Sequence, residues 1–165
     1  MSDNNSTETN LRNWLLGMGF SISQVQQQDP NVEFNLGIAN AFGTGIAINV
    51  VKLRNQPMIM TGLGIGIDPI HKQAFSELGN REKSDYLFEI QKNLLFLGVD
   101  FNFVPNATDP QQIQINHSIY VEDITRTSLM ASLKTVRNAG LYLIWSYRNK
   151  FTTEMGSSSS PTVYG

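Results

Sequence analysis

Glycine occupies every second position over one short apolar segment, and this pattern limits what the segment can form. In residues 58–67, MIMTGLGIGI, bulky aliphatic side chains alternate with Gly62, Gly64 and Gly66. Successive side chains of a β-strand point to opposite faces, so a strand here would have one bulky face and one smooth face. The alternative is a glycine-rich loop that holds a phosphate in front of a helix.

The spacing of these glycines argues against a nucleotide site. The dinucleotide fingerprint Gly-x-Gly-x-x-Gly would need its third glycine at position 67, which is Ile67. No Gly-Lys-Ser/Thr sequence follows, so the segment does not match a P-loop either. A helix predicted to begin at Asp68 keeps anion binding open as a minor alternative, although Asp68 itself is negatively charged. We therefore interpret residues 58–67 as a strand.

Small residues also share one face of two neighbouring predicted strands. Gly37 and Ala39 fall on one face of a strand predicted at 32–42, and Ala47 falls on one face of a strand predicted at 45–53. Glycine inside a strand often marks the close approach of another backbone. The first interpretation is a helix packed tightly on this smooth face. The second is that a partner segment, a second subunit or a ligand lies there.

Hydrophobic periodicity predicts the element order α-β-β-β-α-β-β-α over a single domain at 10–151. The elements are a helix capped by Thr9, strands at 32–42, 45–53 and 58–67, a middle helix from Asp68 that breaks or kinks at Gly79 and ends at Gly98, strands at 99–104 and 113–121, and a last helix capped by Asp123. Because hairpins dominate, we predict an α+β fold with a mostly antiparallel, five-stranded sheet and three main helices. Residues 1–9 and 152–165 are predicted to be disordered or flexible tails.

Composition excludes several classes of function. Of 165 residues 16% are charged, and the net charge is −2, so the chain lacks the basic surplus that a nonspecific nucleic-acid binder needs. It contains no cysteine, which excludes disulfides, thiolate catalysis and zinc–sulfur sites. No apolar run is long enough for a membrane span, and the polar N-terminus is not a secretory signal. We expect a soluble, cytoplasmic protein without membrane or nucleic-acid partners.

The polar side chains form no recognisable catalytic motif. His71 lies in the first turns of the middle helix, and His117 lies on the apolar face of a strand, where a core histidine with a hydrogen-bond partner is expected. Ser132 and the other serines lack the glycine elbow of a nucleophile. The sequence therefore predicts no enzyme, no cofactor and no metal site.

Aromatic residues near the end of the last helix lie partly outside its apolar stripe. In GLYLIWSYRNKF, Leu143 and Tyr147 share one side of the helix, whereas Tyr142 and Trp145 lie partly on another. Trp, Tyr and Arg are enriched in binding hot spots, but a wide buried face under a large sheet would need the same residues. Both interpretations stay open. The residues of the candidate partner or ligand face are Gly37, Ala39, Gly62, Gly64, Gly66, Tyr142 and Trp145.

Four segments together suggest a family. They are LRNWLLGMGF, MTGLGIGIDP, SDYLFEIQKNLLFLG and SIYVEDITRTSLMASLKTV. In this order, over Leu11 to Phe151, the chain resembles type III secretion chaperones and the bacterial YbjN-like proteins, and most of all an archaeal family of uncharacterised small proteins with that fold. The resemblance implies a small acidic homodimer that binds other proteins. It places the dimer contact on the middle helix and the strand after it, at Tyr86, Ile90, Leu94, Phe101 and Phe103.

The function predicted from these observations is non-enzymatic protein binding by a homodimer, in the manner of a chaperone that holds a client. Burial of apolar surface would supply the binding energy. The alternative is a carrier of a small molecule or lipid, with the Gly/Ala-rich sheet face lining its pocket.

Overall fold

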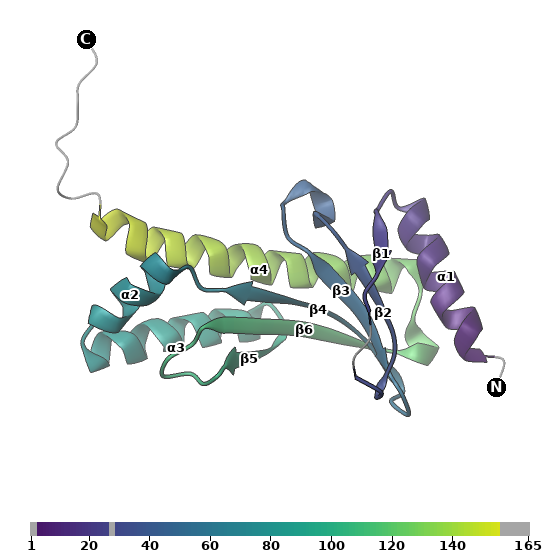
Figure 1. The fold of residues 1–165 in the computed structure, drawn as a ribbon, viewed down its shortest axis with the longest axis horizontal. Coiled ribbons are helices and arrows are strands. Elements are labelled where there is room, and N and C mark those ends of the chain that lie inside the picture. Colours follow the sequence, from purple (N-terminus) through teal and green to yellow (C-terminus); the bar gives the residue numbers. More distant parts are fainter. Residues whose placement is uncertain (1–2, 27–28, 156–165) are drawn as a thin grey trace, which may run out of the picture.

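The computed structural model describes residues 3–26 and 29–155 as an α+β fold (Figure 1). The sheet has six antiparallel strands in the order β1-β2-β3-β4-β6-β5, and four α-helices accompany it within the described residues. The elements are α1 (Asp3–Gly17), β1 (Ile22–Gln24), β2 (Val32–Ile38), η1 (Ala41–Gly43), β3 (Ile48–Leu53), β4 (Met58–Gly66), α2 (Pro69–Glu77), α3 (Asn80–Phe96), β5 (Asp100–Val104), β6 (Gln112–Tyr120), η2 (Val121–Asp123) and α4 (Arg126–Met155).

The predicted class and the antiparallel sheet are confirmed, whereas the counts of five strands and three helices are wrong. The sixth strand is β1, in which Ile22 pairs with Ile38. Its three residues lie between the first predicted helix and the strand predicted at 32–42, where so short a strand shows no usable alternation. The fourth helix arises because Leu78 and Gly79 are extended, which divides the middle helix into α2 and α3 at the predicted break.

Helix ends follow local side-chain chemistry, with one correction. The carboxylate of Asp68 accepts a hydrogen bond from the backbone N–H of Ile70 at 2.9 Å, which confirms the predicted cap of α2. The prediction that Asp123 caps the last helix is wrong, because Asp123 lies in a 3-10 turn. Thr125 takes that role, since its hydroxyl accepts from the backbone N–H of Ser128 at 3.0 Å.

The chain termini also differ from the prediction. Helix α1 begins at Asp3, so most of the segment 1–9 predicted as a tail is helical, and Thr9 is not its cap. Glu8 supports this first helix through an ion pair with Arg12 at 3.0 Å. At the other end α4 continues to Met155, and the rest of the predicted tail, 156–165, lies outside the described residues.

The first two predicted strands are shorter than expected. Strand β2 ends at Ile38, because Asn40 and Phe42 have φ of 49° and 57° and turn the chain into η1. Strand β3 begins only at Ile48.

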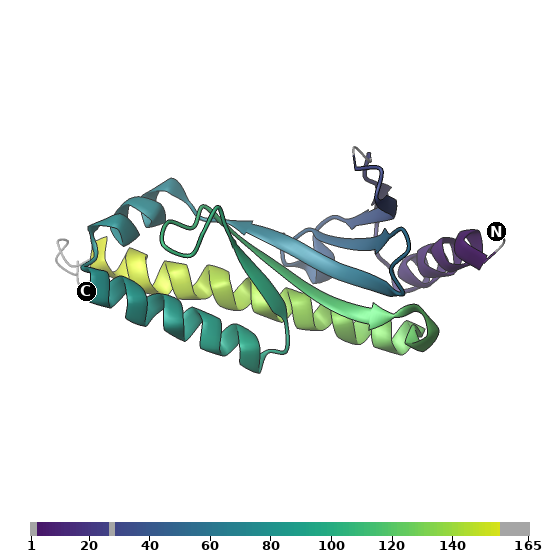
Figure 2. The same cartoon turned by 90° about the horizontal axis from the view of Figure 1, so that it is seen from below.

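The core lies between the sheet and α4, which runs along one face of it. Figure 2 shows α3 and α4 lying side by side on this face, while no helix of the described residues lies on the opposite face. The side chains that meet in this layer are almost fully buried. They are Ile48, Val50, Ile59, Leu63, Ile113 and Ile115 from the sheet and Leu129, Leu133, Val136 and Leu143 from α4.

Candidate functional site

The two faces of the sheet have different side chains. Along β4, Ile59, Thr61 and Leu63 are buried toward α4, whereas Gly62 and Gly64 belong to the opposite face. We call this opposite side the bare face, because no described helix covers it. One row crosses all six strands of the bare face, as paired residues Ser23, Gly37, Asn49, Gly62, Asn116 and Asp100. The bare face is therefore rich in amide and small side chains.

No described helix packs on the glycines of β4. The interpretation that a helix covers the smooth face is therefore wrong. A Cβ at Gly62 would meet the carbonyl oxygen of Ile115 at 3.1 Å, and one at Gly64 would overlap the side-chain amide of Gln112. At Gly66 a Cβ would meet nothing within 4 Å. Every neighbouring atom thus comes from the adjacent strand β6. The amide side chain of Gln112 occupies the space above Gly64.

The glycine that does bring a helix close to the sheet lies in α4. A Cβ at Gly140 would lie 3.0 Å from a methyl group of Leu63 and 3.4 Å from one of Ile46. This contact is on the covered face, where the helix axis must approach the strands closely. The close approach of helix and sheet is therefore located at Gly140, on the covered face, and not at the alternating glycines of β4.

The seven residues of the predicted partner or ligand face lie on separate surfaces. Gly37 and the β4 glycines belong to the bare face, and Ala39 is exposed just after β2. Tyr142 and Trp145 lie on α4, which packs against the other face of the sheet. The Tyr142 hydroxyl accepts a hydrogen bond from the side-chain amide of Asn93 at 3.1 Å and so joins α4 to α3, whereas Trp145 is 62% exposed.

Three large apolar side chains project from α3 into solvent. Phe88, Leu95 and Phe96 are 61%, 68% and 83% exposed, although Ile90 and Leu94 on the inner side of the same helix are buried. Leu95 follows Phe88 by seven residues, so both side chains point in nearly the same direction. We call Phe88, Leu95 and Phe96 the α3 outer face. Helix α3 is therefore apolar on two sides, which is typical of a helix with packing partners on both.

The predicted dimer contact only partly matches this surface. Ile90, Leu94 and Phe103 are 1%, 0% and 7% exposed, so the core of their own chain already covers them. Tyr86 and Phe101 are half-buried and pack against the same core. The sequence did carry a signal for the outer face, because apolar residues at i, i+7 and i+8 fall outside the stripe that contains Ile90 and Leu94.

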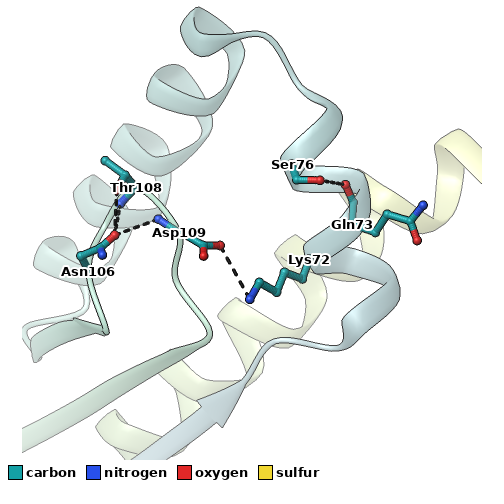
Figure 3. Close-up of polar contacts among 6 residues, drawn as sticks. All are labelled: Lys72, Gln73, Ser76, Asn106, Thr108 and Asp109. Carbon is teal, nitrogen blue, oxygen red and sulfur yellow. Dashed lines mark hydrogen bonds and ion pairs between the residues drawn. The ribbon is translucent and has the colours of Figure 1, made fainter.

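A groove runs between α3 and the connection from β5 to β6. Its wall is held by Asn106, whose side-chain oxygen accepts from the backbone N–H groups of Thr108 at 3.0 Å and Asp109 at 2.9 Å (Figure 3). Lys72 of α2 reaches toward Asp109, with 3.8 Å between the charged atoms. The groove residues are Asn80, Lys83, Ser84, Leu87, Phe88, Gln91, Ala107 and Thr108. The loop thus flanks the α3 outer face as an ordered wall.

One polar network lies in the core between α4 and the sheet. The Ser132 hydroxyl is 2.6 Å from that of Thr61 and 2.8 Å from Nδ1 of His117. His117 is half-buried and has the hydrogen-bond partner that its place on the apolar face predicted. A serine bonded to a histidine resembles part of a hydrolytic site, but Ser132 and Thr61 are 1% and 0% exposed. The arrangement therefore links helix to sheet rather than presenting a nucleophile.

Neither a cluster of metal-ligating side chains nor a membrane-spanning helix occurs within the described ranges, 3–26 and 29–155. No group of three or more histidine, aspartate or glutamate side chains there could hold a metal ion. No helix in the same ranges is long and apolar enough to cross a membrane.

Two tyrosine hydroxyls are buried among the aromatic rings that join α2, α3 and α4. The rings of Tyr86 and Tyr147 meet edge to face with centroids 5.4 Å apart, and neither hydroxyl has a hydrogen-bond partner among the described residues. Burial raises the pKa of Tyr86, and the neighbouring Tyr147 and Tyr142 raise it further. Burial likewise raises the pKa of Tyr147. Both residues are therefore held in the neutral form.

These raised pKa values predict a loss of stability in alkali. Above about pH 10 the tyrosines of the unfolded chain ionise while those of the native state keep their protons, so stability is retained below this pH and lost above it. Urea unfolding at pH 8 and pH 11 should show a larger loss for the wild type than for the double variant Tyr86→Phe/Tyr147→Phe. At pH 8 the variant should be at least as stable, because the lost hydroxyls have no partner. Equal losses in both proteins would contradict the prediction.

Comparison with known proteins shows the family but no activity. No curated protein matches the chain. The crystal structure of an uncharacterised protein from Methanothermobacter thermautotrophicus shares the fold, with a TM-score of 0.79 and 19% identity over 88% of this chain and 99% of that chain. This archaeal match supports one part of the resemblance seen in the sequence, and neither comparison supports secretion chaperones or YbjN-like proteins. The model of DUF2299, a family of uncharacterised conserved proteins, matches residues 7–147, and the chain therefore belongs to that family.

Proposed function

We propose that the protein is a non-enzymatic protein-binding module that works as a homodimer joined through the α3 outer face. The observation that carries this proposal is the exposure of Phe88, Leu95 and Phe96, which are 61%, 68% and 83% exposed on one helix. Large apolar side chains that gather on the surface of a folded chain commonly mark an interface. Phenylalanine is also among the residues enriched at the centres of interfaces.

A second copy of the chain is the partner that this surface fits best. A two-fold dimer brings the same patch from both subunits together, so an apolar helix face can complement itself without matched charges. The charged residues between Phe88 and Phe96 are Glu89 and Lys92, and they form an ion pair with each other. The patch therefore offers apolar contact with its nearest charge neutralised.

The neighbouring edge strand supports the same geometry. Strand β5 is the last of the sheet and pairs only with β6, so no described strand occupies its other edge. An unpaired edge is a template for another strand. Because α3 leads directly into β5 through Gly98, two copies that meet at α3 would bring these edges near each other. Edge pairing could then extend the sheet across the dimer.

The test compares self-association of matched variants by sedimentation velocity at about 10–100 μM. The wild type should sediment as a dimer, and Phe88→Ser/Leu95→Ser should weaken association roughly 100-fold or more and sediment as a monomer with unchanged circular dichroism. The control is Leu16→Ser/Ile70→Ser, which removes two side chains of similar exposure, 58% and 55%, from other helices and should stay dimeric. A monomeric wild type, or a dimeric Phe88→Ser/Leu95→Ser variant, would refute the proposal.

The surface that we propose for binding a protein client is the bare face. Its amide-rich surface has donors and acceptors that a bound segment could pair with, and a dimer through α3 and β5 would leave it open. The chaperone-like form of the proposal rests on the resemblance in element order alone. The alternative of a carrier is less favoured, because Gln112 fills the space above Gly64 and the hollow around Gly62 is open to solvent.

A further inference from the structure

A separate cavity of about 210 Å³ lies where the end of β4, the start of α2 and the second half of α4 meet. Its apolar lining comes from Ile65 and Ile67 on one side and Leu143 and Ile144 on the other. The cavity is distinct from the α3 outer face and shares only Gly66 with the bare face, so an inference about it is independent of the proposed dimer. Its volume corresponds to about seven water molecules, which suits a small metabolite and is too small for a nucleotide or a peptide.

Two opposite charges share this cavity without neutralising each other. Asp68 and Arg148 both line it, and neither forms an ion pair with any residue that the structure describes. Asp68 accepts a hydrogen bond from the backbone N–H of Ile70 through one oxygen, which leaves its other oxygen without a partner among those residues. Arg148 is exposed, and its guanidinium makes no hydrogen bond with a described residue. The cavity thus carries one acidic and one basic side chain that have no charged partner among the described residues.

The third polar group of the cavity is held in place by aromatic packing. The ring of His71 stacks on Tyr147 with centroids 6.4 Å apart and lies 6.1 Å from the ring of Phe151. This packing fixes the imidazole at the cavity wall, where a ring nitrogen can meet a ligand oxygen. The hydroxyl of Tyr147 is enclosed by protein and is not available to a ligand. Only the ring of Tyr147 therefore contributes to the lining.

We propose that this cavity binds a free α-amino acid with an aliphatic side chain of about the size of leucine. The ammonium group lies against the carboxylate of Asp68, and the carboxylate group lies against Arg148 with His71 beside it. The aliphatic side chain packs against Ile65, Ile67, Leu143 and Ile144. A zwitterion is the class that matches both charges, because a fatty acid would leave Asp68 facing an anion and an amine would leave Arg148 facing a cation.

Isothermal titration calorimetry on the purified full chain tests this proposal with four probes. They are L-leucine, 4-methylpentanoate, 3-methylbutylamine and glycine, which separate the two charges and the side chain. Leucine should bind with a Kd of roughly 10–500 μM, and each of the other three should bind at least about tenfold more weakly. Failure of leucine to bind at 10 mM, or equal binding of leucine and glycine, would overturn the proposal.

Charge-removing variants assign the two ends of the ligand. Arg148→Met keeps an unbranched apolar stem without the guanidinium group, and it should weaken leucine at least about tenfold while leaving the amine unchanged. Asp68→Asn keeps the helix cap, since asparagine caps as well as aspartate, and should weaken leucine and the amine but not the acid. Arg81→Met, an exposed control on α3, should bind leucine as the wild type does. Leucine affinity that is unchanged in both cavity variants would show that the site lies elsewhere.

Discussion

Replacing Phe151 with alanine is expected to lower the free energy of unfolding by about 4 kcal/mol, the largest loss that we predict for a single substitution. The side chain is fully buried, although it lies close to the C-terminal end of α4. Its ring packs against those of Tyr86 and Tyr147, with centroids 5.4 and 5.8 Å away, and meets Phe75 edge to face at 6.4 Å. Removal would leave a cavity at the point where α2, α3 and α4 join.

Urea unfolding followed by tryptophan fluorescence and circular dichroism gives the measurement. Trp145→Ala is the matched control, because it removes a larger aromatic side chain from the same helix at a position that is 62% exposed. We expect it to change stability by less than about 0.5–1 kcal/mol. A loss below about 1 kcal/mol for Phe151→Ala would show that α4 does not anchor the three helices as described.

Ser132→Ala is expected to cost about 2 kcal/mol of stability, which is the second largest effect. The substitution removes less than one methylene equivalent of volume, so the cost comes from polarity rather than from packing. Without the Ser132 hydroxyl, the hydroxyl of Thr61 and Nδ1 of His117 both lose their close partner, at 2.6 and 2.8 Å, in the layer between α4 and the sheet. A buried polar group left without a partner costs about 1–3 kcal/mol.

The double variant Ser132→Ala/Thr61→Val separates this explanation from simple loss of contact. Valine has nearly the shape of threonine without the hydroxyl, so the double variant no longer buries a hydroxyl whose remaining partner, the carbonyl oxygen of His117, lies 3.4 Å away. We expect it to be more stable than Ser132→Ala alone, although Thr61→Val by itself should destabilise the wild type. Strictly additive effects of the two substitutions, measured by urea unfolding, would contradict a shared network.

Much of the fold could be predicted because its signals are local. The alternation of side chains identified β4 and β6, and Asp68-Pro69 located the start of α2. The break at Gly79 was visible as well, since glycine is a poor residue for a helix interior. The errors fell where the signal was short or ambiguous. Strand β1 has only three residues, and Asp123 resembled a helix cap although Thr125 provides it.

The candidate sites were harder to predict, because they depend on which segments meet. Asp68 and Arg148 are eighty positions apart in the sequence (148 − 68) and line one cavity only because α4 returns past the start of α2. Tyr142 and Trp145 were grouped with the β4 glycines, yet they belong to a helix on the other face of the sheet. The exposed residues of α3 could have been found from their spacing, but nothing local indicates whether a second apolar stripe faces solvent or the core.

By itself, the sequence determined the α+β class, the largely antiparallel pairing, most helix and strand positions and the absence of cysteine chemistry. These properties follow from local conformational preference and from the period of the apolar pattern. Only the tertiary structure decided that α4 packs on the bulky face of the sheet and leaves the glycine face bare. A helix can pack on either face of a strand that has one smooth face. It packs on the face where more apolar area is buried, and that area depends on the whole sheet.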